Sequence, residues 1–220
     1  MNRALWPQNA MRFDAPYEQL EGAVMWGAGG NAQGPKVPPG TYTVKVSSGG
    51  WSQSQTFTLR ADPRYQPEMT PEEGQQQLRI AREVGGWIKV LYDDVRTMRD
   101  LKSQADKLVE NAPNNATVAR AATALRDRLT SVEGDITQLQ GEGGQDSLNF
   151  PGRMDNQLIV LYSNVVGPER RLGTPAMERY DDLKPEATAL IDRANTAIKE
   201  GVTEFNAVAT KAGLAPLVIK

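Results

Sequence analysis

Two runs of apolar residues between residues 70 and 139 form the clearest pattern in the chain. Hydrophobic residues recur three and four positions apart in both runs, which predicts two amphipathic helices, because such positions share one helical face. Asn111-Ala112-Pro113-Asn114-Asn115 separates the runs and predicts a short connection, so we expect a helical hairpin. A register slip near Lys102 favours packing within one bundle over a long free coiled coil. The runs comprise Val84, Ile88, Leu91, Val95, Met98, Leu101, Ala105 and Leu108, and then Val118, Ala122, Leu125, Leu129, Val132, Ile136 and Leu139.

Sequence signals also mark helix boundaries and two further helices. Thr70-Pro71-Glu72-Glu73 combines an N-capping threonine, a proline at the first helical position and a glutamate at the third, which predicts the first start. A third helix is predicted over about residues 155–166, and Thr174-Pro175 predicts the cap of a fourth. Pro185 is expected to kink the fourth helix and Gly213 to end it. The residues expected to be buried are Leu158, Leu161, Tyr162 and Val165 in the third helix and Met177, Tyr180, Leu183, Ala187, Leu190, Ala194, Ala197, Gly201, Phe205, Val208 and Ala212 in the fourth.

The N-terminal part has the alternation of β-strands instead. Thr41–Val46 and Gln53–Leu59 place apolar residues at every second position, and Ser47-Ser48-Gly49-Gly50 between them predicts a hairpin turn. An isolated hairpin is marginal in water, so we expect strands near Leu5 and Val24 to complete a small sheet.

These patterns predict an α+β fold in two parts. We expect a small antiparallel Ig- or fibronectin-like β module over residues 1–62, a linker over 63–69 and an antiparallel four-helix bundle over 70–220. The short links between the helices favour antiparallel neighbours. In the core we expect Leu125, Leu129, Val132 and Ile136 to be buried against Leu91, Val95 and Met98.

Composition narrows the function classes. Hydrophobic residues make up 39% of the 220 residues and charged residues 24%, which is typical of a soluble globular protein. The net charge of -2 is spread along the chain, so neither nucleic acid nor a lipid surface is an expected partner. Cysteine and histidine are absent from the sequence, which excludes disulfides, thiol nucleophiles and the commonest general base and metal ligand. We therefore expect no cofactor, no metal site and no membrane-spanning segment.

Several stretches offer candidate chemistry. Gly27–Gly34 is glycine-rich, but it lacks the Lys-Ser/Thr pair and the following helix of a phosphate loop, so a strand connection is expected. Trp6 and Trp26 are expected in the core of the β module. Trp51 follows the predicted turn, and there a place in the core and a role in stacking on a ligand such as a sugar are both open.

Helical positions give few further candidates. Asp93-Asp94 and Asp181-Asp182 suggest the two carboxylates of a glycosidase, but adjacent helical residues point about 100° apart, so exposed helix surface is expected. Gly85-Gly86 lies inside the first helix, where close approach of a neighbouring element is favoured over a hinge. Leu217-Val218-Ile219 is expected to lie back on the bundle or against a partner domain.

A family resemblance adds to this picture. It is carried by the order of five segments, which are Asn2-Arg3-Ala4-Leu5-Trp6, Met25-Trp26-Gly27, Gly34-Pro35-Lys36-Val37-Pro38-Pro39-Gly40-Thr41-Tyr42-Thr43-Val44, Leu59-Arg60-Ala61-Asp62-Pro63-Arg64 and Leu148-Asn149-Phe150-Pro151-Gly152-Arg153-Met154-Asp155-Asn156-Gln157-Leu158. These segments resemble the region that follows the β-propeller in bacterial BNR-repeat, sortilin-like proteins, which are often labelled glycosyl hydrolases. The chain has no Ser-x-Asp-x-Gly-x-x-Trp repeat, so it lacks the propeller and none of the family's functional residues can be assigned here.

The resemblance implies a secreted or periplasmic protein, with this chain as one part of a longer precursor. If Met1 is the natural start, the chain is expected in the cytoplasm. The favoured hypothesis is a non-catalytic accessory module that stabilises a propeller or binds a protein partner, with no catalytic residues of its own. The alternative is a carbohydrate-active hydrolase that uses carboxylates such as Asp14, Asp62 or Asp155.

Overall fold

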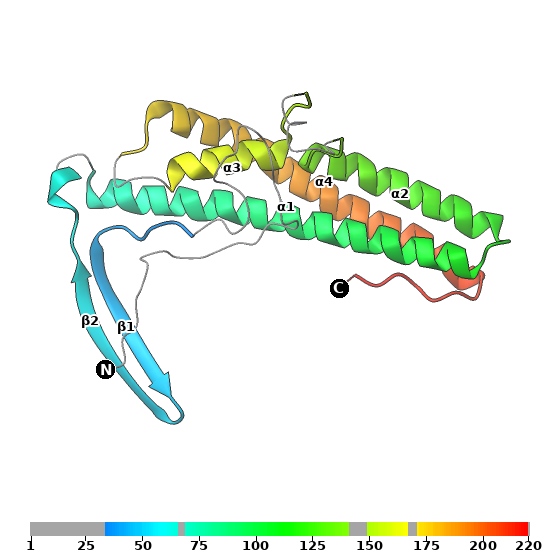
Figure 1. Cartoon of the computed structure of the whole chain (residues 1–220), viewed down its shortest axis with the longest axis horizontal. Coiled ribbons are helices and arrows are strands. Elements are labelled where there is room, and N and C mark those ends of the chain that lie inside the picture. The colour runs from blue at the N-terminus through cyan, green and yellow to red at the C-terminus, as the bar shows by residue number, and fades with distance from the viewer. Residues whose placement is uncertain (1–33, 66–68, 141–148, 167–170, 220) are drawn as a thin grey trace.

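The computed structural model describes most of the chain and shows an α+β protein (Figure 1). A single hairpin of β1 (Gly40–Ser48) and β2 (Trp51–Leu59) forms the sheet in the part described, and a short 3-10 helix follows at Pro63–Tyr65. The strands predicted near Leu5 and Val24 lie outside the described residues. The described residues are 34–65, 69–140, 149–166 and 171–219.

Four helices make up the helical body. They are α1 (Pro71–Asn111), α2 (Ala116–Ile136), α3 (Met154–Val165) and α4 (Thr174–Lys211). Figure 1 shows α1 and α4 extending along the body, with α2 beside one part of their length and α3 beside the other. All four predicted helices are thus present.

Contacts along α1 establish the order of its neighbours. Near the start of α1, Gln77 Nε2 donates to the carbonyl oxygen of Val165, the last residue of α3, over 2.6 Å. Nearer the end of α1, Asp106 pairs with Arg126 in the middle of α2, and only four residues separate the two helices. The chain therefore runs out along α1, back along α2 and then α3, and out again along α4.

This order corrects the predicted antiparallel four-helix bundle, because α2 and α3 run in the same direction. The prediction assumed that every connection is short enough to reverse the chain. The connection between Ile136 and Met154 is long, so α3 can continue the path of α2. Residue spacing alone does not distinguish these two arrangements.

The predicted apolar seams form one continuous core. The expected contact set of Leu91, Val95, Met98, Leu125, Leu129, Val132 and Ile136 is buried. Leu158, Leu161, Tyr162 and Val165 of α3 are buried as well. Leu139 is the clear exception, at 41% exposure, because α2 ends at Ile136 and the helical periodicity no longer applies beyond it.

Two N-terminal caps were predicted, and one of them is present. Glu73 N–H donates to Thr70 Oγ1 over 3.2 Å and Thr70 N–H donates to Glu73 Oε2 over 2.7 Å, which confirms the capping box of α1. The predicted Thr174 cap is wrong. The carbonyl oxygen of Gly173 accepts the N–H of Met177, so Gly173 is the N-cap and Thr174 is already helical.

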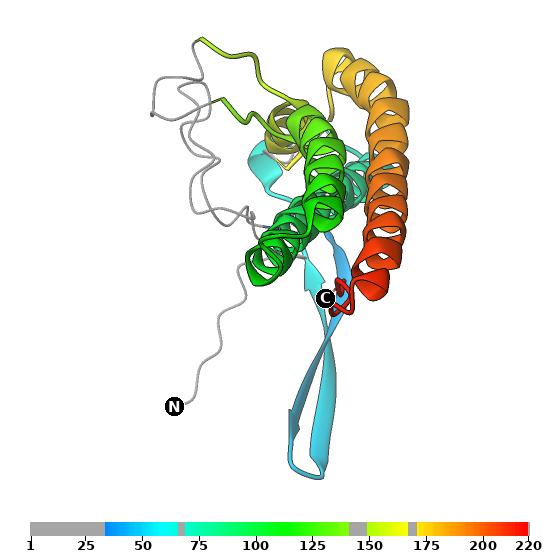
Figure 2. The same ribbon diagram turned by 90° about the vertical axis from the view of Figure 1, so that its right-hand side faces the viewer.

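Proline and glycine positions shape the long helices. Pro185 lies within α4, which continues through it and curves gently in Figure 2. Gly201 of α4 permits a close approach to α2, since a Cβ there would lie 2.6 Å from Leu125 Cδ1. For Gly86 the expected close approach is not confirmed, because no atom lies within 4 Å of the position of its Cβ.

Candidate interaction surface

The hairpin is built as its sequence predicts, with longer strands. β1 and β2 pair in antiparallel register from Gly40 opposite Leu59 to Ser48 opposite Trp51. Gly49, at the first turn position, has φ +57°, a backbone conformation that residues with a Cβ rarely adopt. The turn is therefore two residues long, and the pairing extends beyond both predicted strands.

The two faces of the hairpin differ in chemistry. Directly opposite residues share a face, so Thr41, Thr43, Lys45 and Ser47 lie with the serines and threonines of β2 on a polar face. The other face carries the apolar residues Tyr42, Val44, Val46, Trp51 and Phe57, with Gln53 and Gln55 opposite the two valines, and we call it the hairpin apolar face.

The hairpin apolar face is open to solvent. Val46 is 55% exposed and Trp51 54% exposed, and Val44 and Phe57 are also classed among the exposed large hydrophobic residues. Figures 1 and 2 show why, since the hairpin projects away from the helical body. Trp51, the candidate for ligand stacking, lies next to the turn at the far end of this face.

The base of the hairpin is fixed to the helical body. The Tyr42 hydroxyl donates to the Pro38 carbonyl oxygen over 2.5 Å, and its ring centroid lies 6.0 Å from that of Phe57. Burial raises the pKa of Tyr42, and the nearby Arg82 partly opposes this shift. Pro38 in turn lies on α1, because a Cβ at Gly74 would be 3.0 Å from Pro38 Cβ. The hairpin is thus held at its base, and Val46 and Trp51 toward its far end are more than half exposed.

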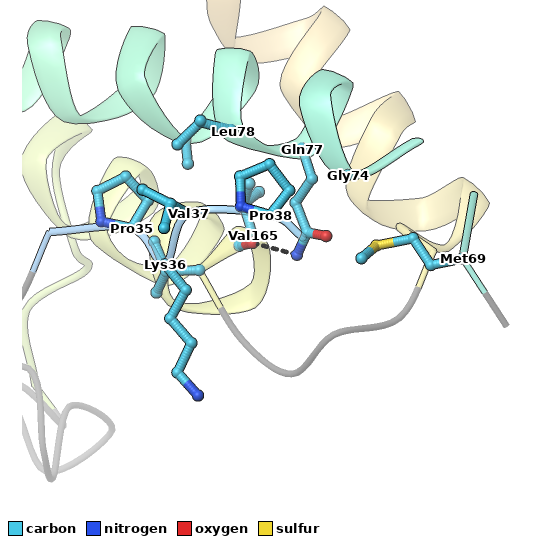
Figure 3. A pocket seen from close by; sticks show the side chains of 11 residues that line it. Pro35, Lys36, Val37, Pro38, Met69, Gly74, Gln77, Leu78 and Val165 are labelled. Carbon is cyan, nitrogen blue, oxygen red and sulfur yellow. Dashed lines mark hydrogen bonds between the residues drawn. The ribbon is translucent and has the colours of Figure 1, made fainter. Parts of the chain in front are cut away.

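A small cavity lies where this base meets α1 and α3 (Figure 3). Its volume is about 30 Å³, and Pro35, Pro38, Leu78 and Val165 are among the residues that line it. Ligand pockets are typically about 300–1,000 Å³. This cavity has room for about one water molecule and is too small for a substrate. The residues around it pack the base of the hairpin against α1 and α3.

Two of the three candidate carboxylates of a hydrolase, Asp62 and Asp155, lie within the described residues, and each is engaged in local contacts. Asp62 makes hydrogen bonds and an ion pair with Arg64, which hold its pKa down to about 2. Asp155 is buried at the start of α3, where its Oδ1 accepts the N–H of Asn156 over 2.6 Å. Asp14 lies outside the described residues, as do Trp6, Trp26 and all but the last residue of Gly27–Gly34.

The two Asp-Asp pairs have different environments. Asp181 and Asp182 are exposed, as predicted, and Asp93 is half-exposed between Lys89 and Arg96. For Asp94 the prediction of exposed surface is wrong, because only 9% of the residue is exposed. Its Oδ2 is buried without a hydrogen-bond partner in the described part of the chain. Burial, with the charge of Asp93 as a second cause, raises the pKa of Asp94 to about 6.

Two polar clusters that the sequence did not suggest join the helices. Glu133 of α2 is 2% exposed and accepts from Arg99 Nε over 2.6 Å and from Lys102 Nζ over 2.5 Å. Tyr180 of α4 donates to Glu83 Oε2 of α1 over 2.6 Å. Arg99 and Lys102 lie three residues apart, a spacing that brings both side chains to one helical face and could have indicated a buried acid opposite.

The cluster around Tyr180 has no free reactive group. Lys184 Nζ lies 2.8 Å from Glu83 Oε1 and 3.2 Å from the Tyr180 hydroxyl, and Trp87 stacks on the Tyr180 ring. Burial raises the pKa of Tyr180, and its hydrogen bond to Glu83 adds to the shift. The donors and acceptors satisfy one another, so this cluster links α1 to α4.

Among the residues that the structure describes, no group of three or more acidic side chains could hold a metal ion. The same residues contain no helix that is long and apolar enough to cross a bilayer. No family model, curated protein or solved structure matches the chain. The hairpin apolar face, with its base anchored and its length exposed, is therefore the best candidate site.

Proposed function

We propose that this chain is a non-catalytic interaction module that binds a partner protein domain through the hairpin apolar face. The observation that carries the proposal is the exposure of Val46 and Trp51, both more than half exposed, on a projecting hairpin. Apolar residues clustered on one exposed face are typical of protein interaction sites. In the described helices, by contrast, the apolar seams pack on one another.

The proposed partner is the β-propeller of a BNR-repeat, sortilin-like protein, of which this chain would be the C-terminal part. The family resemblance supports this partner and implies a secreted or periplasmic compartment. A propeller blade presents strands and loops that can pack on the apolar side chains or pair with a hairpin edge. Lys45 is the one charged residue of the two strands and lies on the other face, so the contact is expected to be apolar and weakly dependent on salt.

The Ig- or fibronectin-like form of the β module belongs to the same proposal. It requires strands near Leu5 and Val24, predicted from their sequence, beside the hairpin. Such strands would extend the sheet at an edge of β1 or β2 and leave the apolar face for the partner. If they covered the face instead, Trp51 in the isolated chain would be shielded from solvent.

The alternative, a carbohydrate-active hydrolase, has less support. A glycosidase needs one carboxylic acid with a raised pKa beside a sugar-sized cleft. The pKa of Asp62 is instead held down to about 2, and this side chain is paired with Arg64. Aryl glycosides and polysaccharides incubated with the purified chain are expected to remain intact.

The test uses the gene extended upstream of Met1. The upstream domain, produced separately, is titrated with this chain in a calorimeter, and Val46→Thr and Trp51→Ser are compared with Lys45→Thr on the polar face. We expect the two apolar-face variants to weaken binding about tenfold or more, which is about 1.4 kcal/mol. Lys45→Thr should bind as the unmodified chain does.

Two outcomes would overturn the proposal. One is an upstream sequence that encodes no propeller repeat in frame. The other is binding that is equally strong with and without the apolar side chains of Val46 and Trp51. Acrylamide quenching of Trp51, in a chain whose other tryptophans are replaced by phenylalanine, reports separately whether the isolated chain covers this face.

A further inference from the structure

The chain turns back on itself after α4. Leu214 N–H donates to the Ala209 carbonyl over 2.9 Å and Gly213 N–H donates to the Thr210 carbonyl over 3.1 Å. With Gly213 at φ +70°, these are the two hydrogen bonds of a Schellman motif, as predicted for a helix that ends at this glycine. Residues 214–219, here named the returning segment, then run back beside α1 (Figure 1).

Two side-chain amides hold the main chain of the returning segment. Asn206 of α4 accepts the Leu217 N–H at 2.7 Å and donates to the Leu217 carbonyl at 3.1 Å. Gln104 of α1 accepts the Val218 N–H at 3.0 Å and donates to the Val218 carbonyl at 2.9 Å. Each amide thus takes the place of one residue in an antiparallel β ladder, where opposed residues exchange two such hydrogen bonds.

Leu217 is the one buried side chain of the returning segment, and Leu214 is partly buried against the same core. Leu217 is 4% exposed and belongs to the main core, whereas Val218 and Ile219 are both more than half exposed. Gln104 is oriented by a further hydrogen bond from its Nε2 to Asp100 Oδ2 at 2.8 Å. The groove therefore holds a length of main chain and buries the side chain of Leu217, whereas the two side chains that follow are largely exposed.

We propose that the groove between α1 and α4 is a binding site for an extended peptide, and that the returning segment is its occupant within the same chain. The peptide belongs to another polypeptide, is extended over at least two residues and carries an aliphatic residue at the position of Leu217. The four main-chain hydrogen bonds are independent of the peptide's sequence, and the leucine pocket supplies selectivity.

The covalent link explains why the site is filled by the returning segment. Pro216 fixes its own φ and restricts Ala215 to extended conformations, so the segment loses little entropy on binding. A short connection of this kind gives an effective concentration on the order of millimolar. A separate peptide must exceed that concentration, or bind better, to displace it.

The experiment releases the segment in the full chain with Leu217→Asp, which places a charge in the apolar pocket. The probe is a fluorescein-labelled synthetic peptide of residues 213–220, and binding is followed by fluorescence anisotropy. We expect the Leu217→Asp chain to bind the probe at least about tenfold more tightly than the unmodified chain, because the groove is empty. Replacing both Gln104 and Asn206 by alanine in that chain should weaken binding about tenfold or more.

Peptide variants supply the matched controls. A probe with the Ile219→Thr change should bind within about twofold of the original, since more than half of Ile219 is exposed to solvent. A probe with the Leu217→Asp change should not bind. Equal binding of the probe by the unmodified and Leu217→Asp chains would overturn the proposal. Probe binding that is unchanged when Gln104 and Asn206 are both replaced by alanine would overturn it as well.

A second measurement applies if the Leu217→Asp chain loses its helical circular dichroism. The unmodified chain, labelled with ¹⁵N, is titrated with unlabelled peptide to about 10 mM, above the effective concentration of the linked segment. We expect the amide resonances of Leu217 and Val218 to move to those of a released segment. Resonances that stay in place throughout the titration would overturn the proposal.

Discussion

The helical body and the hairpin both follow regular apolar patterns, but they differ in what covers the apolar residues. Leu129 in α2 and Phe205 in α4 are at most 1% exposed, because the helices pack on one another around a common core. Val46 and Trp51 in the hairpin are more than half exposed, although their alternation is just as regular. A periodic pattern therefore shows which side chains share a face, and a second element must still be present to bury that face.

The two regions also differ in their polar contacts. The helical body carries ion pairs between helices, such as Glu133 with Arg99 and Lys102. In the hairpin the polar face is made of serines and threonines around Lys45. The body is thus fixed by packing and by polar contacts, whereas the hairpin is fixed mainly through its base at Tyr42 and Pro38.

The largest expected difference between the regions comes from removing one apolar side chain in each. Leu129→Ala should lower the free energy of unfolding by about 2–5 kcal/mol, because it leaves a cavity in a packed core. Val46→Ala should change it by less than about 0.5 kcal/mol, since the side chain is exposed. Urea titration followed at 222 nm measures both values. Similar losses for the two variants would contradict the comparison.

Loss of the buried charge in the helical body should have the next largest effect. Glu133→Gln leaves Arg99 and Lys102 without their shared acid, and we expect a loss of about 1.5–3 kcal/mol. The matched control is Asp106→Asn, whose pair with Arg126 is about half exposed and should be worth less than about 1 kcal/mol. Thermal unfolding of the two variants compares them directly. A control that is as destabilising as Glu133→Gln would show that burial does not decide the effect.

Asp94 tests burial through pH. Its pKa is raised by burial from the ordinary 3.8 to about 6, so an unfolded chain loses this proton at a lower pH than the folded chain does. Unfolding then releases a proton between about pH 4 and pH 6, and stability falls as pH rises through that window. We expect Asp94→Asn to match the unmodified chain near pH 4 and to exceed its stability by on the order of 2 kcal/mol at pH 7.

Urea titrations of both chains at pH 4, 5, 6 and 7 measure this difference. Asp182→Asn serves as the exposed control and should show no pH-dependent gain over the same range. An Asp94→Asn chain whose advantage is the same at every pH would rule out titration of this carboxyl as the cause.

The smallest expected effect separates packed from open positions within the helices. Gly86→Ala should stabilise the protein by about 0.5–1 kcal/mol, because alanine favours helix and no atom lies within 4 Å of the new Cβ. Gly201→Ala should not stabilise the protein in this way, because the new Cβ would lie 2.6 Å from Leu125 Cδ1. Differential scanning calorimetry resolves the two shifts. A gain at Gly201 equal to that at Gly86 would mean that Leu125 moves aside without cost.

Much of the secondary structure could be predicted from local chemistry. The capping box at Thr70 and Glu73, the turn at Gly49 and the helix end at Gly213 depend on residues that are close in sequence. The seam through Leu125 and Leu129 follows from helical periodicity in the same way. Sequence determined these features because each is decided within one or two turns of the chain.

The candidate surfaces could be predicted only in part. The alternation of Tyr42, Val44 and Val46 placed these residues on one face, but it did not show that the face would be exposed. Trp51 was suggested for ligand contact by its place after a turn, and the structure shows that four apolar residues share its face of the hairpin. The apolar tail at Leu217 was expected to lie back on the bundle or against a partner domain, and it lies on the bundle. The amides that hold it had no sequence signal, because Gln104 and Asn206 lie on helices far apart in the chain.

Tertiary structure alone decided the remaining features. Asp93 and Asp94 are neighbours of the same type, yet one is half-exposed and the other buried, because helix packing covers one side of α1. Likewise α3 continues the direction of α2, because the long connection between Ile136 and Met154 does not require the chain to reverse. The sequence determined which faces are apolar because side-chain direction is local. Hydrophobic burial is non-directional, so an apolar face does not by itself select its partner. Which element covers each face is decided by how helices that are distant in sequence pack on one another.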